Sequence, residues 1–130
     1  MKHGIVNSKP RQGLSFAPDR DIYPFTQVNA VPAYIQHSAH IAPGREGLFE
    51  LVKTAPKELH YENALIVADG DYVMLHSRIS GIGQPGNWVV VDILRIENGL
   101  IAEHWDVIQD DATRESSKSG RPMFGDKFPA

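Results

Sequence analysis

The chain contains no cysteine, which excludes disulfide bonds, thiolate metal ligands and cysteine nucleophiles. Long apolar runs are missing too. None approaches the roughly 20 residues that a membrane helix requires, and the first residues hold no apolar segment of signal-peptide length. These absences favour a cytoplasmic protein that does not enter membranes.

An excess of positive charge is also absent, since 13 Lys and Arg face 16 Asp and Glu, for a formal net charge of −3. Without a basic cluster, nucleic-acid binding is not expected. Gly81-Ile82-Gly83 lacks the third glycine and the following helix of a dinucleotide-binding motif. The His, Asp and Glu residues show none of the local spacings typical of metal sites. We therefore expect neither a cofactor nor a metal ion.

What the chain does contain is proline in its first quarter. Pro10, Pro18, Pro24 and Pro32 leave no room for a helix of ordinary length between them. Residues 1–33 are nevertheless too rich in apolar side chains for a disordered tail. We expect an atypical N-terminal arm, part of which docks on the rest of the protein or on another subunit.

The remaining residues predict the core of one domain that spans residues 1–130. Apolar spacing predicts a helix over 45–53 that ends before Pro56. Strand patterns cover 59–67, 72–80, 89–95 and 100–108, and an extended piece precedes the helix at 33–37. The fold class is α+β, with an antiparallel sheet packed on a helix. Residues 34–110 form this core, and 111–130 form an extended C-terminal tail.

The last two strands carry unexpected polar residues. The Asn98-Gly99 dipeptide between them is typical of a tight hairpin turn because it tolerates positive φ angles. Alternation places His104 and Asp106 on the same face of an apolar strand, and Asp92 interrupts the preceding strand. Carboxylates among apolar residues need a partner or a function. The hairpin therefore predicts one wall of a pocket with a polar end.

Each of these groups has a structural alternative. His104 and Asp106 could act as acid and base, or could form a structural hydrogen-bonded pair. Asp92 could be a base in an apolar pocket, or could form an ion pair with Arg78 or Arg95. His76 lies in mid-strand, where a histidine is more often structural. His37 and His40 lie at a loop edge, where proteins often meet ligands.

Six segments stand out in order along the chain: YIQH at 34–37, GREGL at 44–48, ADGDYVMLHSR at 68–78, VDILRIENG at 91–99, EHWDVIQ at 103–109 and SGRPMFGD at 119–126. Together they resemble the SnoaL-like polyketide cyclase family, within the nuclear transport factor 2-like superfamily. The resemblance covers roughly residues 33–128.

The resemblance implies a strongly curved, cone-shaped antiparallel sheet around a helix, an apolar cavity, and commonly a dimer formed through the sheet. It also implies an acidic cavity residue that acts without a cofactor in an intramolecular aldol closure. Asp92, Asp106, His104 and His37 are the catalytic candidates that it suggests. We further expect His76, Tyr34, Trp105 and Arg78 to contact the substrate.

The N-terminus differs from the family, whose members usually begin with two helices that cap the cone. Here the proline-rich arm stands in their place, so these helices are missing or replaced. Exposing the cavity lining would cost about 25 cal/mol per Å². We expect the arm, the C-terminal tail or a neighbouring subunit of a homo-oligomer to cover it.

Two functions fit the sequence. The first is a cofactor-independent acid/base enzyme, a lyase or isomerase, acting on a small apolar carbonyl compound by cyclisation or aldol closure, isomerisation or hydration. The second is a non-catalytic module that keeps the cone fold and binds a small molecule or supports oligomeric assembly. A closed pocket in which Asp92, His104 and Asp106 converge would favour the enzyme.

Overall fold

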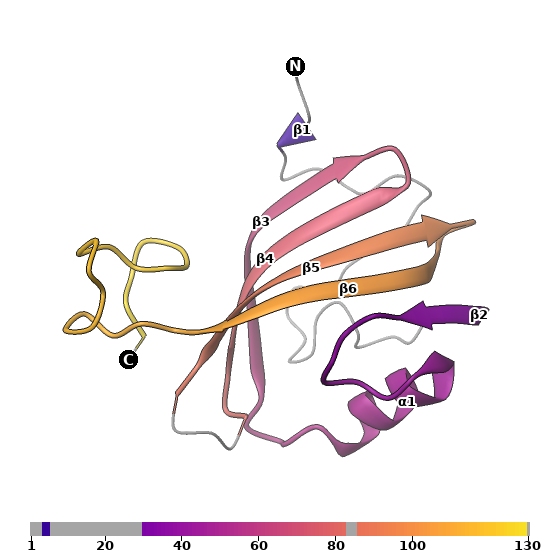
Figure 1. Cartoon of the computed structure of the whole chain (residues 1–130), viewed down its shortest axis with the longest axis horizontal. Helices are drawn as coiled ribbons and strands as arrows, with labels where there is room; N and C mark the ends of the chain where they lie inside the picture. Colours follow the sequence, from indigo (N-terminus) through magenta and orange to yellow (C-terminus); the bar gives the residue numbers. More distant parts are fainter. Residues whose placement is uncertain (1–3, 6–29, 83–85, 130) are drawn as a thin grey trace.

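The computed structural model describes residues 4–5, 30–82 and 86–129, which form a six-stranded sheet and one helix (Figure 1). The strand order is β1-β3-β4-β5-β6-β2. The elements are β1 (Gly4–Ile5), β2 (Ala30–Gln36), α1 (Gly44–Thr54), β3 (His60–Asp69), β4 (Tyr72–Ser80), β5 (Trp88–Glu97) and β6 (Leu100–Asp110).

The predicted antiparallel meander is confirmed for β3 to β6, because each of these strands pairs antiparallel with the next. Asn98 (φ 53°) and Gly99 (φ 78°) form the two-residue turn between β5 and β6. Both residues need the left-handed conformation that Asn and Gly adopt most readily. The turn sets the pairing of Ile96 with Ile101, and a one-residue shift between Ile96 and Arg95 then gives the register that carries the site.

The edge strand β2 differs from the prediction, because it pairs parallel with β6 and makes the sheet mixed. It begins at Ala30, before the extended piece expected from Ala33, and includes Pro32. A sheet edge tolerates proline because only one side of the strand donates to a neighbour. Most of the predicted arm (1–3 and 6–29) lies outside the described residues. The expectation that the capping helices are missing or replaced falls on these same residues.

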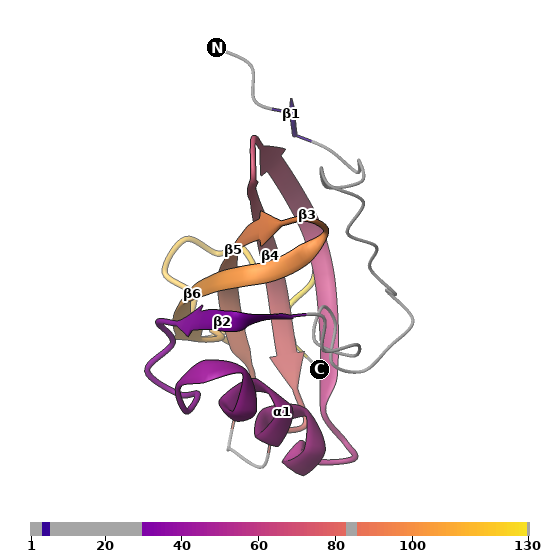
Figure 2. The ribbon, with the colours of Figure 1, turned by 90° about the vertical axis from the view of Figure 1, so that its right-hand side faces the viewer.

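The core lies between α1 and the inner face of the curved sheet (Figure 2). Leu48 of α1, Leu75 of β4 and Leu94 of β5 are fully buried there. The predicted helix is confirmed over Gly44–Thr54 and ends just before Pro56. No helix in the described part of the chain is long and apolar enough to cross a membrane.

The C-terminal tail packs on the other side of the sheet, its outer face. The Arg78 guanidinium of β4 donates from Nε to Asp111 Oδ2 (2.6 Å) and from Nη2 to the Lys127 carbonyl (3.1 Å). It also lies over the Phe124 ring, with its Cζ 5.1 Å from the ring centroid. The expectation that the tail could cover the cavity is therefore wrong for its described residues.

Gly81, just after β4, lies very close to the backbone of Glu58, and this close approach can be tested. Its φ is +70°, and a Cβ built on it would lie 1.9 Å from the Glu58 carbonyl oxygen. Gly70 has a similar φ of +60° but open space around it. Gly70→Ala should therefore cost only the conformational penalty, about 1 kcal/mol, whereas Gly81→Ala should cost roughly 1–3 kcal/mol more because the backbone must shift. Urea unfolding of both variants measures the difference, and equal losses would contradict the close approach.

Candidate active site

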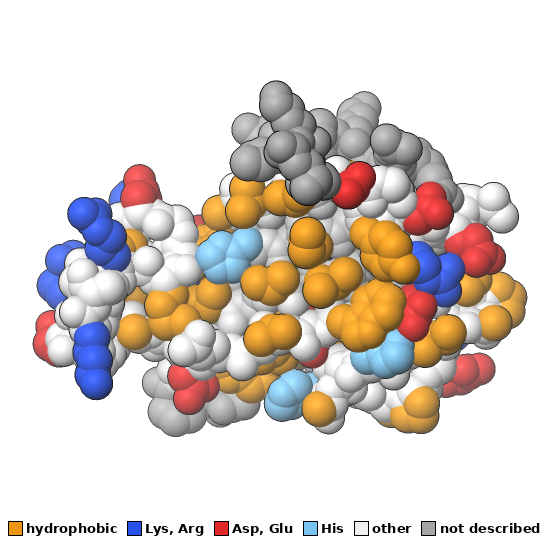
Figure 3. All heavy atoms as spheres, turned by 45° about the horizontal axis from the view of Figure 1, so that its top comes forward, with side chains coloured by type: hydrophobic (Ala, Val, Ile, Leu, Met, Phe, Trp, Pro, Cys, Tyr) orange, Lys and Arg blue, Asp and Glu red, His pale blue; other side chains and the backbone are white. Residues whose placement is uncertain are grey.

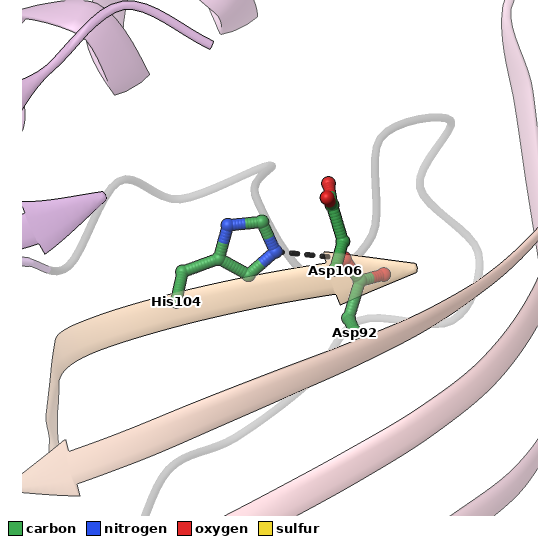
Figure 4. A group of neighbouring side chains, drawn as sticks. All are labelled: Asp92, His104 and Asp106. Carbon is green, nitrogen blue, oxygen red and sulfur yellow. Dashed lines mark hydrogen bonds and ion pairs between the residues drawn. The ribbon is translucent and has the colours of Figure 1, made fainter. Parts of the chain in front are cut away.

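Three titratable side chains rise from the same face of the β5–β6 hairpin (Figure 4). Asp92 and Asp106 face each other across the ladder, and His104 lies two pairs along, opposite Leu94. The ligand-type atoms of these three residues lie within 4.8 Å of one another. The predicted proximity of His104 and Asp106 extends to Asp92 because the hairpin register aligns the two strands.

Asp92 is buried, and both of its carboxyl oxygens have hydrogen-bond partners. His104 Nε2 lies 2.8 Å from Oδ1, and the Tyr61 hydroxyl donates to Oδ2 at 2.7 Å. Ser77 Oγ in turn donates to the Tyr61 hydroxyl oxygen at 2.7 Å. The buried carboxylate is thus held by polar partners on both sides, as a buried charge requires.

The alternative partners expected for Asp92 are wrong. Arg78 pairs with Asp111 on the outer face, and Arg95 donates to Glu103 Oε1 at 2.9 Å. Alternation explains this, because residues 78 and 95 of β4 and β5 point away from the inner face that carries Asp92. The hydrogen bonds from His37 and then from Arg95 lower the pKa of Glu103.

An apolar cavity of about 280 Å³ opens over the Asp92–His104–Asp106 cluster. Tyr61, Ser38 and His40 add polar groups to its wall, and the His40 ring lies 5.5 Å from that of Trp88. The C-terminal end of α1 and the loop after it close one side. The main apolar wall residues are Ile41, Leu51, Ile79, Trp88, Val90 and Ile108.

Four predicted site residues lie on the outer face of the sheet and do not reach this cavity. His37 bonds Glu103 at 2.6 Å and stacks on Trp105, with ring centroids 4.8 Å apart. His76 contacts Phe124 edge-on at 5.6 Å, and Arg78 anchors the tail. All four lie on the outer face, because residues 76, 78 and 105 alternate with the inward residues 77, 79, 104 and 106. The expected roles of His37, His76, Trp105 and Arg78 in the pocket are therefore not supported by their positions.

Tyr34 is buried in the core rather than exposed to the cavity. Its hydroxyl oxygen accepts a hydrogen bond from Gln36 Nε2 at 2.7 Å. Burial raises the pKa of Tyr34, the Gln36 bond lowers it, and the negative charges of Asp92 and Asp106 add to the increase. Tyr34 thus supports the site from behind the cavity wall.

A family model for the SnoaL-like domain matches residues 19–104 of the 130. The chain belongs to the SnoaL-like domain family. This confirms the resemblance that the sequence segments suggested.

Solved structures confirm the cone-shaped fold of this SnoaL-like protein. A candidate polyketide cyclase from Bacillus cereus ATCC 10987 matches with a TM-score of 0.53 and 21% identity, over 62% of this chain and 58% of that one. AclR, a candidate hydroxylase from Streptomyces galilaeus, matches with a TM-score of 0.50 and 25% identity, over 62% and 63%. The match spans about three fifths of each structure's length. No curated protein matches the chain.

The SnoaL-like site contains residues that sequence patterns did not single out. Tyr61 and Ser77 hold Asp92, and Gln36 contacts His104 Nδ1 at 2.7 Å. Alternation could have placed Ser77 on the inner face of its strand. Gln36 could not be assigned to His104, because their contact depends on the parallel pairing of β2 with β6.

The cluster also has the composition of a cation site, since one imidazole and two carboxylates can bind a divalent ion. Local spacing did not indicate this set because Asp92 comes from a different strand. Its Oδ1 oxygen is already hydrogen-bonded to His104 Nε2. The hydrogen bond between Asp92 and His104 therefore accounts for their closeness without a metal ion.

Removing the Tyr61 hydroxyl tests how Asp92 is held. Tyr61→Phe takes away the donor to Oδ2 and should lower the free energy of unfolding by about 1–3 kcal/mol at neutral pH, because a buried acceptor loses its partner. Tyr72→Phe, at a half-exposed ring, should change it by less than about 0.5 kcal/mol. Urea denaturation measures both. A Tyr61→Phe protein as stable as the Tyr72→Phe control would show that the hydroxyl does not hold Asp92.

Proposed function

We propose that this SnoaL-like protein is a cofactor-independent acid/base enzyme that acts on a small apolar carbonyl compound. The supporting observation is the convergence of Asp92, His104 and Asp106 at the polar end of an apolar cavity. Cyclisation by aldol closure, isomerisation and hydration all need such a proton-transfer group near a bound carbonyl compound. The two structural relatives are named as a cyclase and a hydroxylase, which fits a shared pocket with varied reactions.

The hydrogen bonds favour Asp106 as the group that accepts the substrate proton. Both oxygens of Asp92 already have hydrogen-bond partners, the Tyr61 hydroxyl and His104 Nε2. The Asp106 side chain has no hydrogen-bond partner within the described ranges, and it is half-buried at the cavity wall. Asp106 is thus the carboxylate available to a bound molecule.

The proposed step moves one proton between carbon and Asp106. The Asp106 carboxylate takes a proton from the carbon next to the substrate carbonyl, and the C–H electron pair forms the carbon–carbon double bond of an enolate. The negative charge moves to the carbonyl oxygen, where the proton shared by His104 and Asp92 stabilises it or is transferred to give the enol. The enol or enolate carbon can then attack a second carbonyl or be protonated elsewhere.

The cavity favours a neutral substrate of modest size. Its described lining contains no Lys or Arg to pair with a carboxylate or phosphate, and its two acidic groups would repel an anion. A volume of about 280 Å³ is near the lower limit of typical ligand pockets. We therefore expect a compound of one or two rings, bound through apolar contacts.

The alternative function, a non-catalytic binding module, remains distinguishable by experiment. It predicts that neutral cyclic ketones of one or two rings bind in the cavity, but that the protein does not exchange their α-protons with solvent. Convergence of two carboxylates and an imidazole on one cavity favours the enzyme, because a purely apolar binding site gains nothing from burying them.

Exchange of α-protons tests the enzyme directly. In D₂O, the protein should accelerate deuterium uptake by 2-tetralone and similar neutral cyclic ketones, followed by proton NMR. Asp106→Asn should lower the rate by about 100-fold or more, the usual contribution of a general base, and Asp110→Asn, at an exposed end of β6, should leave it unchanged. No exchange above buffer across the ketone panel, or equal rates for Asp106→Asn and Asp92→Asn and the wild type, would overturn the proposal.

We also propose that the protein forms a homo-oligomer through its outer sheet face, where hydrophobic side chains gather (Figure 3). Two adjacent cross-strand rows form an outer apolar patch. Three of its residues, Leu65, Met74 and Val107, are more than 40% exposed, as is Tyr72 in the neighbouring row. Large apolar patches of this kind mark interaction sites on soluble proteins. The rows are Val67-Met74-Ile93-Trp105 and Leu65-His76-Val91-Val107.

A charged substitution in this patch should lower the oligomeric state. Val107 is 67% exposed, so Val107→Lys should disturb an interface without disturbing the fold of the subunit. Thr113→Lys, at an exposed position outside the patch, serves as the control. Sedimentation velocity should show an oligomer for the wild type and Thr113→Lys and a smaller species for Val107→Lys. A monomeric wild type would refute the proposal.

A further inference from the structure

His104 is a buried histidine whose two ring nitrogens both have hydrogen-bond partners. Its side chain is 0% exposed. Nδ1 lies 2.7 Å from Gln36 Oε1, and Nε2 lies 2.8 Å from Asp92 Oδ1. A neutral imidazole has one donor and one acceptor nitrogen. The partners therefore decide which nitrogen carries the proton, and with it what the ring presents to the cavity.

The Gln36 amide orientation is fixed by a neighbouring backbone group. The Ser38 backbone N–H donates to Gln36 Oε1 at 3.0 Å, and a backbone N–H can only donate. The opposite end of the amide, Nε2, donates to the Tyr34 hydroxyl oxygen at 2.7 Å. The atom that faces His104 is thus the amide oxygen, an acceptor, so His104 Nδ1 must be the donor.

Strand pairing keeps Gln36 in this position. Gln36 of β2 and His104 of β6 are partners in the parallel ladder. The next backbone N–H, that of His37, donates to the His104 carbonyl at 2.9 Å. The contact between the two side chains is therefore set by the sheet rather than by the freedom of a long side chain.

We propose that Gln36 is a positioning residue, which holds His104 with its proton on Nδ1 so that Nε2 faces Asp92 and the cavity. The role of this arrangement in turnover rests on the proposed function, whereas the arrangement itself does not. A ring turned by 180° would place carbon atoms against Gln36 and Asp92 and lose both hydrogen bonds. Gln36 makes that alternative unfavourable.

The His104–Asp92 pair holds one shared proton. The contact between Nε2 and Asp92 Oδ1 needs a single proton, because two bare acceptors would repel each other at 2.8 Å. That proton belongs either to an imidazolium beside a carboxylate or to a carboxylic acid beside a neutral ring, and the pair is neutral overall in both forms. With Nδ1 fixed, this shared proton is the one that the pair can offer to a substrate oxygen. Asp106 then remains the carboxylate that can receive a proton.

Nitrogen NMR of the His104 ring tests the inference without any substrate. In the wild type at neutral pH, the ¹⁵N shift of Nδ1 should be that of a protonated nitrogen. Gln36→Leu removes the acceptor and should move the Nδ1 signal toward the unprotonated value, as the proton redistributes between the two nitrogens. Gln36→Glu restores an acceptor oxygen and should keep Nδ1 protonated. Should Gln36→Leu fail to fold, an unprotonated Nδ1 in the wild type or in Gln36→Glu would still overturn the inference.

Tyr34→Phe is the matched control. It breaks the other hydrogen bond of the Gln36 amide but leaves the Ser38 N–H to orient it, so the His104 Nδ1 signal should not move. A wild-type spectrum with unprotonated Nδ1, or a Gln36→Leu spectrum identical to the wild type, would overturn the inference.

The ketone exchange assay then separates this inference from the proposed function. If the proposed function holds, Gln36→Leu should lower the exchange rate at least about tenfold and alter its pH profile, because a misplaced tautomer disables a catalytic histidine. Gln36→Glu should recover part of the rate. The expected NMR results without any exchange by the wild type would refute the enzyme while leaving the role of Gln36 intact.

Discussion

The whole site depends on keeping one carboxylate, that of Asp92, buried in the middle of a sheet. A buried charge without partners is strongly unfavourable, so every neighbouring strand contributes a group that reduces this cost. Tyr61 comes from β3, Ser77 from β4 and His104 from β6. These hydrogen bonds link four consecutive strands of the meander, and they explain why a polar cluster persists among apolar neighbours. A change in any one of these strands is felt at the carboxylate.

A local irregularity in β3 makes this arrangement possible. Strict alternation would place Tyr61, Asn63 and Leu65 on one face. The register shifts between Asn63 and Leu65, so Tyr61 points inward while Leu65 pairs with His76 on the outer face. Asn63 Nδ2 donates to the Leu65 and His76 carbonyls at 3.3 Å, which satisfies the backbone groups at the shift. The same strand can thus serve a polar cavity on one side and an apolar surface on the other.

Much of this fold could be predicted from local patterns, because the helix and the two hairpins are specified by spacing and turn residues. Asn98-Gly99 predicted the turn between β5 and β6. The pairing of Asp92 with Asp106 also depends on a one-residue register shift between Arg95 and Ile96, which no local pattern indicated. The parallel pairing of β2 was beyond such reasoning, since it joins segments nearly 70 residues apart in the sequence. The expected roles of His37, His76, Trp105 and Arg78 came from the family resemblance and from residue type. Alternation within β6 already assigns Trp105 to the face opposite His104, and the strand register does the same for residues 76 and 78. Residue chemistry thus suggested the candidates, and only those on the inner face of the sheet reach the cavity.

The position of β2 at the edge of the sheet has a consequence for how the protein loses its order. An edge strand with one neighbour is among the first elements to open in local fluctuations, well before the molecule unfolds as a whole. Opening β2 would remove Gln36 from His104 while leaving the four-stranded meander in place. The ring would then be free to turn. The SnoaL-like site should accordingly have its own stability, lower than that of the fold, and a molecule that still appears folded could already have lost the proton arrangement on which its chemistry depends.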